Sequence, residues 1–434
     1  MNRIILVGNG FDLAHKLKTS YNDFINHYWQ NIFDNLRNSL GGYIDLDGLT
    51  VEAFWDNGLP EESSYINFFK YCENYKVEYT FTNELIEVIC KNQSIQNWVD
   101  LEDEYYRLVI KSINDQEINI TKLNDDFANL KGLFIKYLLQ CSPDFSNENL
   151  NEVFEKYYID DIARHIYSDI NIQDFTEEAV NEIAKKESEK LFDFIMNDDP
   201  KKDFSKYDQF VETLSYYLRN NAKIQKGTIE DYYDEIFQIL ISKDAHNLFD
   251  LSPESIFVLN FNYTNVSLLY SNHFTESHLD NDCKFQWPEI NHIHGALNDN
   301  KNPIIFGFGD ELDDNYSKIE KLNDNKYLEN IKSIRYSDTD NYKKLLQYIN
   351  SDQYQICIFG HSCGISDRTM LNTLFEHENC VSIKPYYHLR EDGTDNYSDI
   401  VRNISRNFNN KASMRDKVVN KTYCEPLVRP EKNG

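Results

Sequence analysis

The clearest hydrophobic pattern of this chain lies at its beginning. The apolar run Ile4–Val7 breaks into Gly8-Asn9-Gly10 and continues as the helix-like pattern Phe11–Ala14. A β-branched run that ends in glycines and changes to helical spacing predicts a buried strand, a tight turn and the start of a helix. Such a turn lets the backbone approach a ligand, and the helix N-terminus offers N–H groups to an anion. The pattern favours nucleotide binding, although a plain strand–turn–helix fits it equally well.

The middle of the chain has the spacing of helices. Trp98, Leu101 and Tyr105 begin a helical pattern that predicts a helix over residues 97–113, with Asn97 as its N-cap. Asp103 and Arg107 are spaced to pair on that helix. Further helices are predicted over residues 123–138, 176–196, 207–219 and 229–241. Residues 25–95 have little periodicity and predict only short elements. We therefore expect a mostly helical insertion over residues 30–245.

The second half of the chain alternates between strand and helix patterns. Strands are predicted over residues 256–259, 290–293, 303–307, 355–359 and 381–384, and helices over residues 330–350, 370–375 and 397–408. This alternation is typical of a parallel, doubly wound sheet. The expected architecture is an α/β domain made of residues 1–29 and 246–420, interrupted by the helical insertion.

Composition and charge narrow the classes of function. The chain has 434 residues, with 72 acidic residues against 44 basic ones and a formal net charge of −28. Non-specific binding of nucleic acid, or of an anionic membrane surface, requires a basic face, and no large cluster of lysines and arginines is present. The sequence contains neither an apolar stretch long enough to span a membrane nor a signal peptide. The eight cysteines form no Cys-x-x-Cys motif. These features predict a cytoplasmic globular protein that uses no metal.

Candidate chemistry gathers where the predicted strands end. Four of the strands run into small or polar clusters, namely Gly8-Asn9-Gly10, Asn260-Phe261-Asn262, His292-Ile293-His294-Gly295 and Gly360-His361-Ser362. In an open α/β sheet the carboxyl ends of the strands line the ligand crevice. We therefore expect the four clusters to converge on one site.

These clusters carry a family resemblance. Their order is similar to that in sirtuin-like proteins, which have a glycine-rich first turn, then Thr-x-Asn-x-Asp, then His-Gly, then Gly-[small]-Ser. The chain resembles the bacterial abortive-infection AbiH family more closely. That resemblance rests on GNGFD followed by Thr19-Ser20-Tyr21-x-x-Phe24, on Trp98-x-Asp100-x-Glu102, and on IFGHS with Asp367 soon after.

The resemblance implies a sirtuin-like, Rossmann-type sheet with a pocket for NAD or a related nucleotide. It implies that Asn262 orients a water or the ribose hydroxyls and that His294 is the general base of hydrolysis. The residues that it implies for nucleotide binding are Gly8, Asn9, Gly10, Phe11, Asp12, Asn260, Thr264, Gly360, His361, Ser362 and Asp367.

Two residues depart from the sirtuin-like pattern. Thr264 stands at the usual acidic position of the Asn motif, and Asp12 stands where the first motif has a serine. A carboxylate beside a pyrophosphate is repulsive, so Asp12 either shifts the ligand or has another role.

Structural or alternative roles remain open for several of these residues. His292 could exchange roles with His294, or the two could share a metal, and Glu102 is a possible pocket residue. Asp100 is better explained as a helix cap. Ser362 with His294 and Asp367 could form a serine hydrolase site.

Three functions follow from this resemblance. The first is a phage-defence NAD hydrolase that depletes the cofactor when triggered. The second is a nucleotide-binding sensor or partner module that has lost hydrolysis. The third is a nuclease, which fits a defence role but not the charge. Neither the trigger nor the oligomeric state follows from the sequence, although a homo-oligomer is possible.

Overall fold

A five-stranded parallel sheet forms the centre of the computed structural model, which describes residues 1–39, 41–54, 58–96, 100–115, 117–143, 150–196, 252–271, 288–308 and 311–429. The strands, in the order β6-β5-β1-β7-β8, are β6 (Glu289–His292), β5 (Ile256–Asn260), β1 (Asn2–Val7), β7 (Tyr354–Phe359) and β8 (Cys380–Tyr386). All neighbouring strands run parallel. Five of the predicted strands correspond to these elements, and the parallel α/β sheet is confirmed.

The predicted strand over residues 303–307 is wrong. This segment joins no ladder of the sheet, and the N–H of Ile305 donates to the carbonyl of His294 at 2.8 Å. Ile305 packs with the sheet, whereas Phe306 packs with the helical lobe described below. This short apolar run is buried between two hydrophobic cores. Its hydrophobic pattern does not distinguish it from a buried strand.

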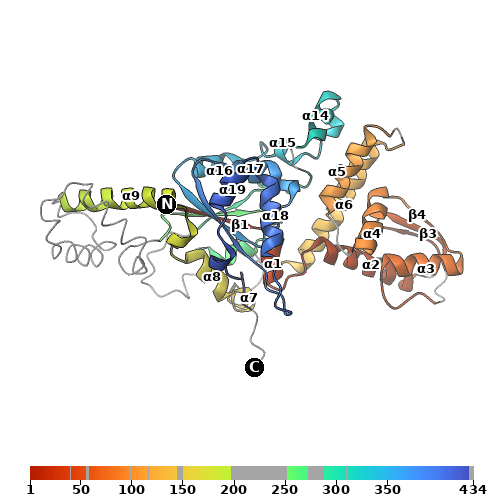
Figure 1. The fold of residues 1–434 in the computed structure, drawn as a ribbon. Helices are drawn as coiled ribbons and strands as arrows, with labels where there is room; N and C mark the ends of the chain where they lie inside the picture. The colour runs from red at the N-terminus through yellow and green to blue at the C-terminus, as the bar shows by residue number, and fades with distance from the viewer. Residues whose placement is uncertain are drawn as a thin grey trace.

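Helices cover both faces of the sheet (Figure 1). Ile4 and Leu6 of β1 face one helical layer, while Ile5 and Val7 face the other, because successive side chains alternate across a strand. The first layer contains α16 (Asn341–Ile349), α17 (Arg368–Phe375), α18 (Tyr397–Asn407) and α19 (Lys411–Lys417). The second contains α1 (Asn9–Ala14), α7 (Leu150–Tyr157), α8 (Asp160–Tyr167) and the 3-10 helix η3 (Val266–Tyr270). Burial on both faces explains the continuous apolar strands.

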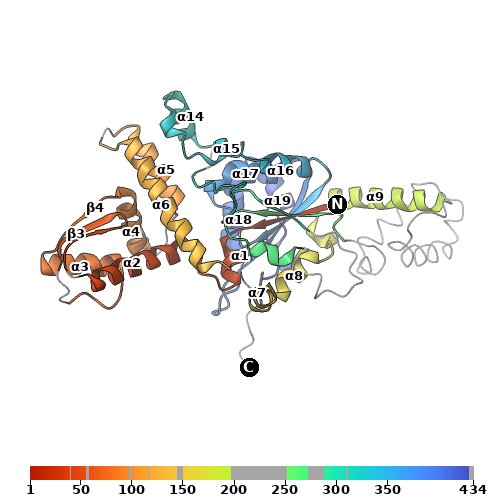
Figure 2. The same ribbon diagram turned by 180° about the vertical axis from the view of Figure 1, so that it is seen from behind.

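A separate lobe lies at one end of the molecule and packs helices on a small sheet (Figures 1 and 2). Its helices are α2 (Tyr21–Asn38), α3 (Tyr65–Tyr75), α4 (Glu84–Gln96), α5 (Leu101–Ser112) and α6 (Ile120–Cys141). Its antiparallel strands are β2 (Gly42–Leu46), β3 (Leu49–Phe54) and β4 (Glu78–Phe81). These strands lie within residues 25–95, where the sequence predicted only unplaced short elements. The inserted portion therefore contains a sheet as well as helices.

The remaining elements are α9 (Glu177–Met196), α14 (Asp314–Lys321), α15 (Lys332–Arg335), η1 (Ile172–Asp174), η4 (Asn325–Tyr327), η5 (Ile365–Asp367) and η6 (Lys421–Tyr423). The predicted helix over residues 176–196 is confirmed as α9. The predicted helix over residues 330–350 is divided into α15 and α16. The helices predicted over residues 207–219 and 229–241 lie outside the described residues.

Helix α5 begins later than predicted. Its N-cap is Asp100, whose Oδ1 accepts hydrogen bonds from the N–H groups of Glu102 at 3.0 Å and Asp103 at 3.2 Å. Asn97, the predicted cap, lies outside the described residues. The predicted pair of Asp103 with Arg107 is confirmed at 2.8 Å. Glu102, in the first turn of this helix, contacts Lys332 in the pocket described below.

The domain boundaries at residues 29/30 and 245/246 stay a prediction. Helices α7 and α8 belong to the inserted range, yet Val153 and Ile162 pack against the sheet. The core of the lobe also includes Tyr263, Phe306 and Phe308 from the second half of the chain. The two portions therefore share hydrophobic cores.

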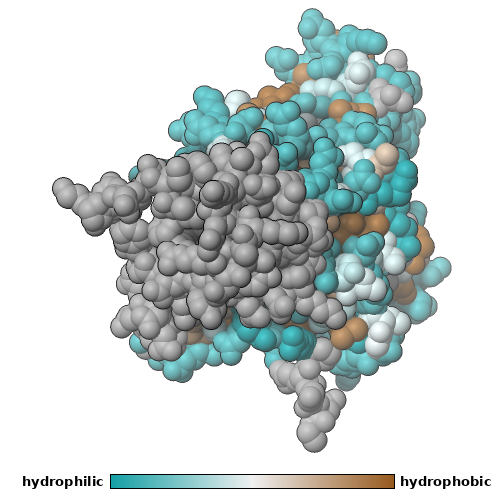
Figure 3. Space-filling model, turned by 60° about the vertical axis from the view of Figure 1, so that its left-hand side comes forward, coloured by the Kyte–Doolittle hydropathy of each residue, from teal (hydrophilic) through white to brown (hydrophobic). Residues whose placement is uncertain are grey.

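The surface is mainly hydrophilic where described residues are visible in Figure 3, with only small hydrophobic areas. Within the described part of the chain, no helix is both long and apolar enough to cross a membrane.

Candidate functional site

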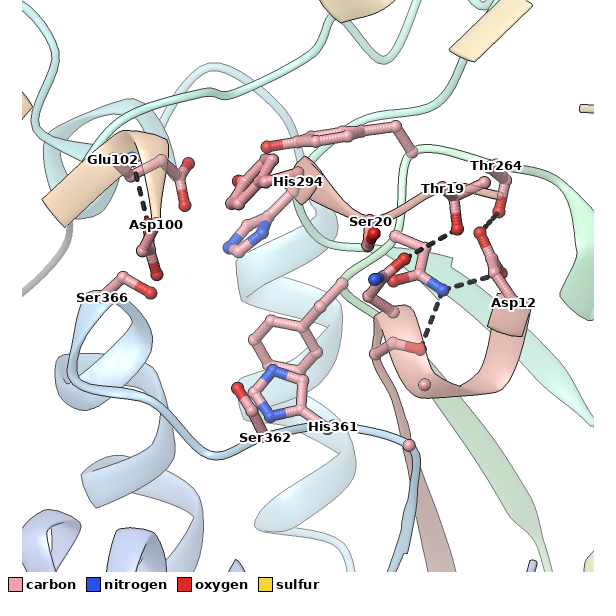
Figure 4. Close-up of a pocket in the computed structure, with 18 of the residues that line it drawn as sticks. Asp12, Thr19, Ser20, Asp100, Glu102, Thr264, His294, His361, Ser362 and Ser366 are labelled. Atoms are coloured by element: carbon pink, nitrogen blue, oxygen red, sulfur yellow. Dashed lines mark hydrogen bonds between the residues drawn. The ribbon is translucent and has the colours of Figure 1, made fainter. Parts of the chain in front are cut away.

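One pocket of about 330 Å³ lies at the carboxyl edge of the sheet (Figure 4). It lies where the strand order reverses, because the chain proceeds from β1 to β5 and β6 on one side and then to β7 and β8 on the other. Such a reversal leaves a crevice at the carboxyl ends of the strands. All four clusters at the strand ends contribute to its lining, as do the start of α2 and the first turn of α5.

The first polar group of the pocket is centred on Asp12, which is 1% exposed. Asn262 Nδ2 donates to Asp12 Oδ1 at 2.8 Å and to the carbonyl of Gly8 at 3.0 Å. Thr264 Oγ1 donates to Asp12 Oδ2 at 2.7 Å. Burial raises the pKa of Asp12 to about 7, although these hydrogen bonds act in the opposite direction. The carboxyl group is therefore held in place and exchanges its proton near neutral pH.

The second polar group is centred on Lys332, which is 1% exposed. Its Nζ donates to Glu102 Oε2 and to Asp367 Oδ1, both at 2.9 Å. Burial would lower the pKa of Lys332, but the two carboxylates hold it well above its usual value. Glu102 Oε1 also accepts from the N–H of Gly307 at 2.9 Å. Lys332 thus forms ion pairs with two buried carboxyl groups.

The two carboxyl groups differ in their proton affinity. Burial raises the pKa of Glu102 to about 7 despite the charge of Lys332. Burial would also raise the pKa of Asp367, but Lys332, with the imidazoles of His294 and His361, holds it well below its usual range. Asp367 therefore carries the negative charge of the group, and Glu102 is the partner that takes up a proton near neutral pH.

The two histidines lie between these groups (Figure 4). His294 Nε2 is 3.2 Å from the hydroxyl of Tyr336 and 3.5 Å from Asp367 Oδ1. Burial, together with Lys332, lowers the pKa of His294 to about 3. A general base works best with a pKa near the operating pH, so this neutral imidazole is a poor base. His361 Nδ1 accepts from the N–H of Cys363 at 3.0 Å, and its Nε2 is 3.6 Å from Asp367 Oδ2.

Glycines at the pocket allow the first and fourth strand-end loops to pack against each other. A Cβ on Gly8 would lie 2.5 Å from the Cα of His361, and one on Gly360 would lie 2.1 Å from the backbone nitrogen of Phe11. Gly360 also has a φ of +70°. The N–H of Gly10 donates to the carbonyl of Gly360 at 2.8 Å. This close approach within the chain explains the glycines, and the N–H of Gly10 is already hydrogen-bonded.

The structure brings together most of the residues predicted for the site. Those that line the pocket are Glu102, Gly8, Asn9, Gly10, Asp12, Asn262, Thr264, His294, Gly360, His361, Ser362 and Asp367.

Three predicted residues lie outside the pocket lining. Phe11 packs in the core on the side of the sheet covered by α1, α7 and α8, and its ring centroid lies 4.6 Å from that of His15. Asn260 Nδ2 donates to Ser267 Oγ at 3.0 Å and lies 3.3 Å from His292 Nδ1. Burial lowers the pKa of His292 to about 4. Phe11, Asn260 and His292 therefore pack next to residues of the pocket without lining it.

The sequence reasoning missed Ser366 and Lys332, which is the one lysine among the described residues of the pocket lining. Lys332 begins a predicted helix, where a lysine usually faces solvent, so no sequence signal identified it. Ser20 and Tyr21 also line the pocket, and the Thr-Ser-Tyr motif that contains them was a usable signal.

The alternative serine hydrolase receives no support from the contacts of Ser362. In the described part of the chain, His294 has hydrogen bonds with the hydroxyl of Tyr336 and the backbone of Phe261, and none with Ser362. Among the described residues, no group of three or more His, Cys, Asp or Glu side chains could hold a metal ion. The expectation of a metal-free site stays a prediction.

Comparison with known proteins places the chain in a family. A sequence profile described as bacteriophage abortive infection AbiH matches residues 4–388. No curated protein and no solved structure matches the chain. The profile covers the sheet, the inserted lobe and every pocket residue named above. The chain therefore belongs to the bacteriophage abortive infection AbiH family, which indicates a role in bacterial defence against phage.

Proposed function

We propose that this protein defends bacteria by hydrolysing the bond between nicotinamide and ribose in NAD or a related nucleotide. The observation that carries the proposal is the buried carboxyl group of Asp12, held by Asn262 and Thr264 in a pocket at the carboxyl edge of a parallel sheet. When the five strands are renumbered 1 to 5 in chain order, their order across the sheet is 3-2-1-4-5. This is the strand order of Rossmann-type nucleotide-binding folds.

The two departures from the sirtuin-like pattern support this proposal because they contact each other. The pattern has a serine in the first motif and an acid at the end of the Asn motif, whereas this chain has Asp12 and Thr264. Thr264 Oγ1 donates to Asp12 Oδ2 at 2.7 Å. The acid and the hydroxyl have thus exchanged places across one hydrogen bond. A carboxyl group remains beside Asn262, supplied by α1 instead of the segment after β5.

Asp12 then takes the role of base that the resemblance implies for His294. The C–N glycosidic bond breaks, and nicotinamide leaves with the bonding electron pair, which neutralises its ring charge. Water adds to the ribose carbon and gives its proton to the carboxylate of Asp12, whose pKa of about 7 suits this transfer. Asn262 orients that carboxylate. The pocket lining contains more carboxyl groups than cationic side chains, which favours an oxocarbenium-like transition state.

The pocket suits the nicotinamide riboside end of NAD better than its pyrophosphate. A volume of about 330 Å³ is near the lower limit of small-molecule pockets. Lys332 is the one lysine or arginine among the described residues of the lining, and two carboxylates already engage it. The phosphates would therefore lie toward the opening of the pocket.

The second candidate is a sensor that binds the nucleotide without turnover. The observation that favours it is the hydrogen bonding of Asn262, whose Nδ2 already donates to Gly8 and Asp12. The low pKa of His294 points the same way, because it removes the expected base.

The test is release of nicotinamide from NAD by the purified protein. Wild type is compared with Asp12→Asn, which keeps the shape of the side chain, and with Asp126→Asn as the control. Asp126 is a buried carboxyl group in the lobe that accepts from the N–H of Glu84. Loss of the base predicts a decrease of about 100-fold or more in kcat for Asp12→Asn alone. The sensor would be established instead if wild type binds NAD tightly but does not turn it over. This must hold both for the purified protein and in cells infected with phage.

A further inference from the structure

A second hollow of about 550 Å³ lies outside the pocket described above, on the other side of α5. Its basic side chains are Arg107 of α5, Arg368 of α17 and Arg406 of α18. Asp103 and Asp313 also line it. We call it the arginine hollow. Three arginines from three helices meet there, in a chain whose net charge is −28.

The linings of the two hollows differ in their balance of basic and acidic side chains. The arginine hollow has three arginines against two aspartates. The pocket at the sheet has Lys332 against the carboxyl groups of Asp12, Asp100, Glu102 and Asp367. The local excess of positive charge in the arginine hollow favours an anion. Arginine guanidinium groups suit phosphate in particular, because their planar N–H groups can form paired hydrogen bonds to its oxygens.

The floor of the arginine hollow is aromatic. Tyr106 and Phe308 stack with ring centroids 3.9 Å apart and an angle of 4° between their planes. Tyr106 is held by its hydroxyl, which donates to Asp313 Oδ2 at 2.9 Å. Ile110 and Ile365 add apolar surface to the lining. A ligand with a flat apolar part and a phosphate would contact this floor and the arginines together.

The arginines differ in how strongly the protein engages them. Arg107 pairs with Asp103 at 2.8 Å and with Glu104 at 3.1 Å, and its side chain is 61% exposed. Arg406 is exposed, and its NH1 donates to Asn403 Oδ1, an uncharged acceptor on the same helix. Arg406 forms no ion pair with any described residue, so it can turn toward a phosphate without giving one up.

From these observations we propose that the arginine hollow is a second binding site, which takes a small phosphorylated ligand such as a nucleoside phosphate. The site does not depend on the reaction proposed above. It shares two helices with the first pocket, because on each helix one residue lines the first pocket and the next residue in the sequence lines the arginine hollow. Glu102 and Asp103 are adjacent on α5, and Asp367 and Arg368 are adjacent at the start of α17. A ligand in the arginine hollow would contact the same two elements that hold Lys332.

The test is isothermal titration calorimetry of the full chain with two probes, ADP and inorganic pyrophosphate. Arg406→Gln should raise the Kd for both probes by about tenfold, the effect of one lost charge-assisted hydrogen bond. The matched control is Arg402→Gln, one turn earlier on α18, where an exposed arginine pairs with Asp399 away from the hollow. This control should keep the wild-type Kd. Arg107→Gln provides a second variant and should weaken binding in the same direction.

The two probes separate recognition of the phosphate from recognition of the base. Tighter binding of ADP than of pyrophosphate would indicate that the floor formed by Tyr106 and Phe308 contacts the base, and equal binding would restrict the site to phosphate. The proposal is overturned if neither probe binds at millimolar concentration, or if Arg406→Gln and Arg107→Gln both bind as wild type does. It is also overturned if Asp12→Asn abolishes binding, because the probes would then occupy the first pocket.

Discussion

Replacing Lys332 with methionine tests how the buried charges at the pocket are balanced. The side chain is 1% exposed, and its Nζ lies 2.9 Å from both Glu102 and Asp367. Methionine is apolar and similar in length, so Lys332→Met removes the charge while leaving little empty volume. Breaking a buried ion pair on one side costs about 3–5 kcal/mol, because the other partner stays buried without compensation. We expect a loss in the free energy of unfolding within that range.

The size of this loss should depend on pH. Without Lys332, burial raises the folded-state pKa of Glu102 and Asp367 above that of the unfolded chain. The folded state then binds more protons than the unfolded state, so its stability falls as pH rises. The variant should lose less relative to wild type near about pH 5 than near about pH 8.

The assay is urea unfolding followed by circular dichroism at the two pH values. Lys122→Met is the control, because Lys122 also contacts two carboxylates but its side chain is 44% exposed. Its loss should cost no more than about 1 kcal/mol. Adding Glu102→Gln to Lys332→Met should recover part of the stability at high pH. Equal losses for Lys332→Met and Lys122→Met, or a loss that is greatest at low pH, would show that Lys332 does not compensate the two buried carboxylates.

Two further predictions concern the strand-end loops. Gly360→Ala should cost more than about 2 kcal/mol, since Gly360 has a φ of +70° and a Cβ would lie 2.1 Å from the nitrogen of Phe11. Gly393→Ala, at a φ of +81° with no neighbour within 4 Å, should cost only about 1 kcal/mol, and equal thermal shifts would contradict this. Asp12 has a raised pKa, so it contributes stability that is present below about pH 4 and is lost as pH rises through about 7. The stability difference between wild type and Asp12→Asn should therefore change by up to about 4 kcal/mol across that window, and a difference independent of pH would contradict the raised pKa.

The sheet could be predicted because its strands are buried on both faces. Ile4–Val7 and residues 356–359 are continuous apolar runs followed by glycine, a pattern that fits few other elements. Strand polarity then placed Gly8, Asn262, His294 and His361 at one edge, and the structure brings them together. Residues 303–307 have the same apolar pattern without a ladder, so burial alone did not identify a strand.

The chemistry of the site could not be predicted from separate motifs. Asp12 and Thr264 are 252 residues apart, and only the structure shows that they are joined by a hydrogen bond. Lys332 has the sequence context of a surface lysine, yet it is enclosed by Glu102 and Asp367. The pKa of His294 likewise depends on burial beside that lysine. These properties arise from contacts between distant segments, which a pattern along the chain does not encode.

The proposed function rests on an exchange in which the acid beside Asn262 stands at position 12 instead of position 264. The most direct measurement is nicotinamide release from NAD by Asp12→Ser, Thr264→Asp and the double variant that combines them. We expect Asp12→Ser to lose activity and the addition of Thr264→Asp to restore a measurable part of it, because a carboxyl group again faces Asn262. If the double variant is folded but no more active than Asp12→Ser, while wild type is active, the exchange of the acid between positions 264 and 12 is wrong.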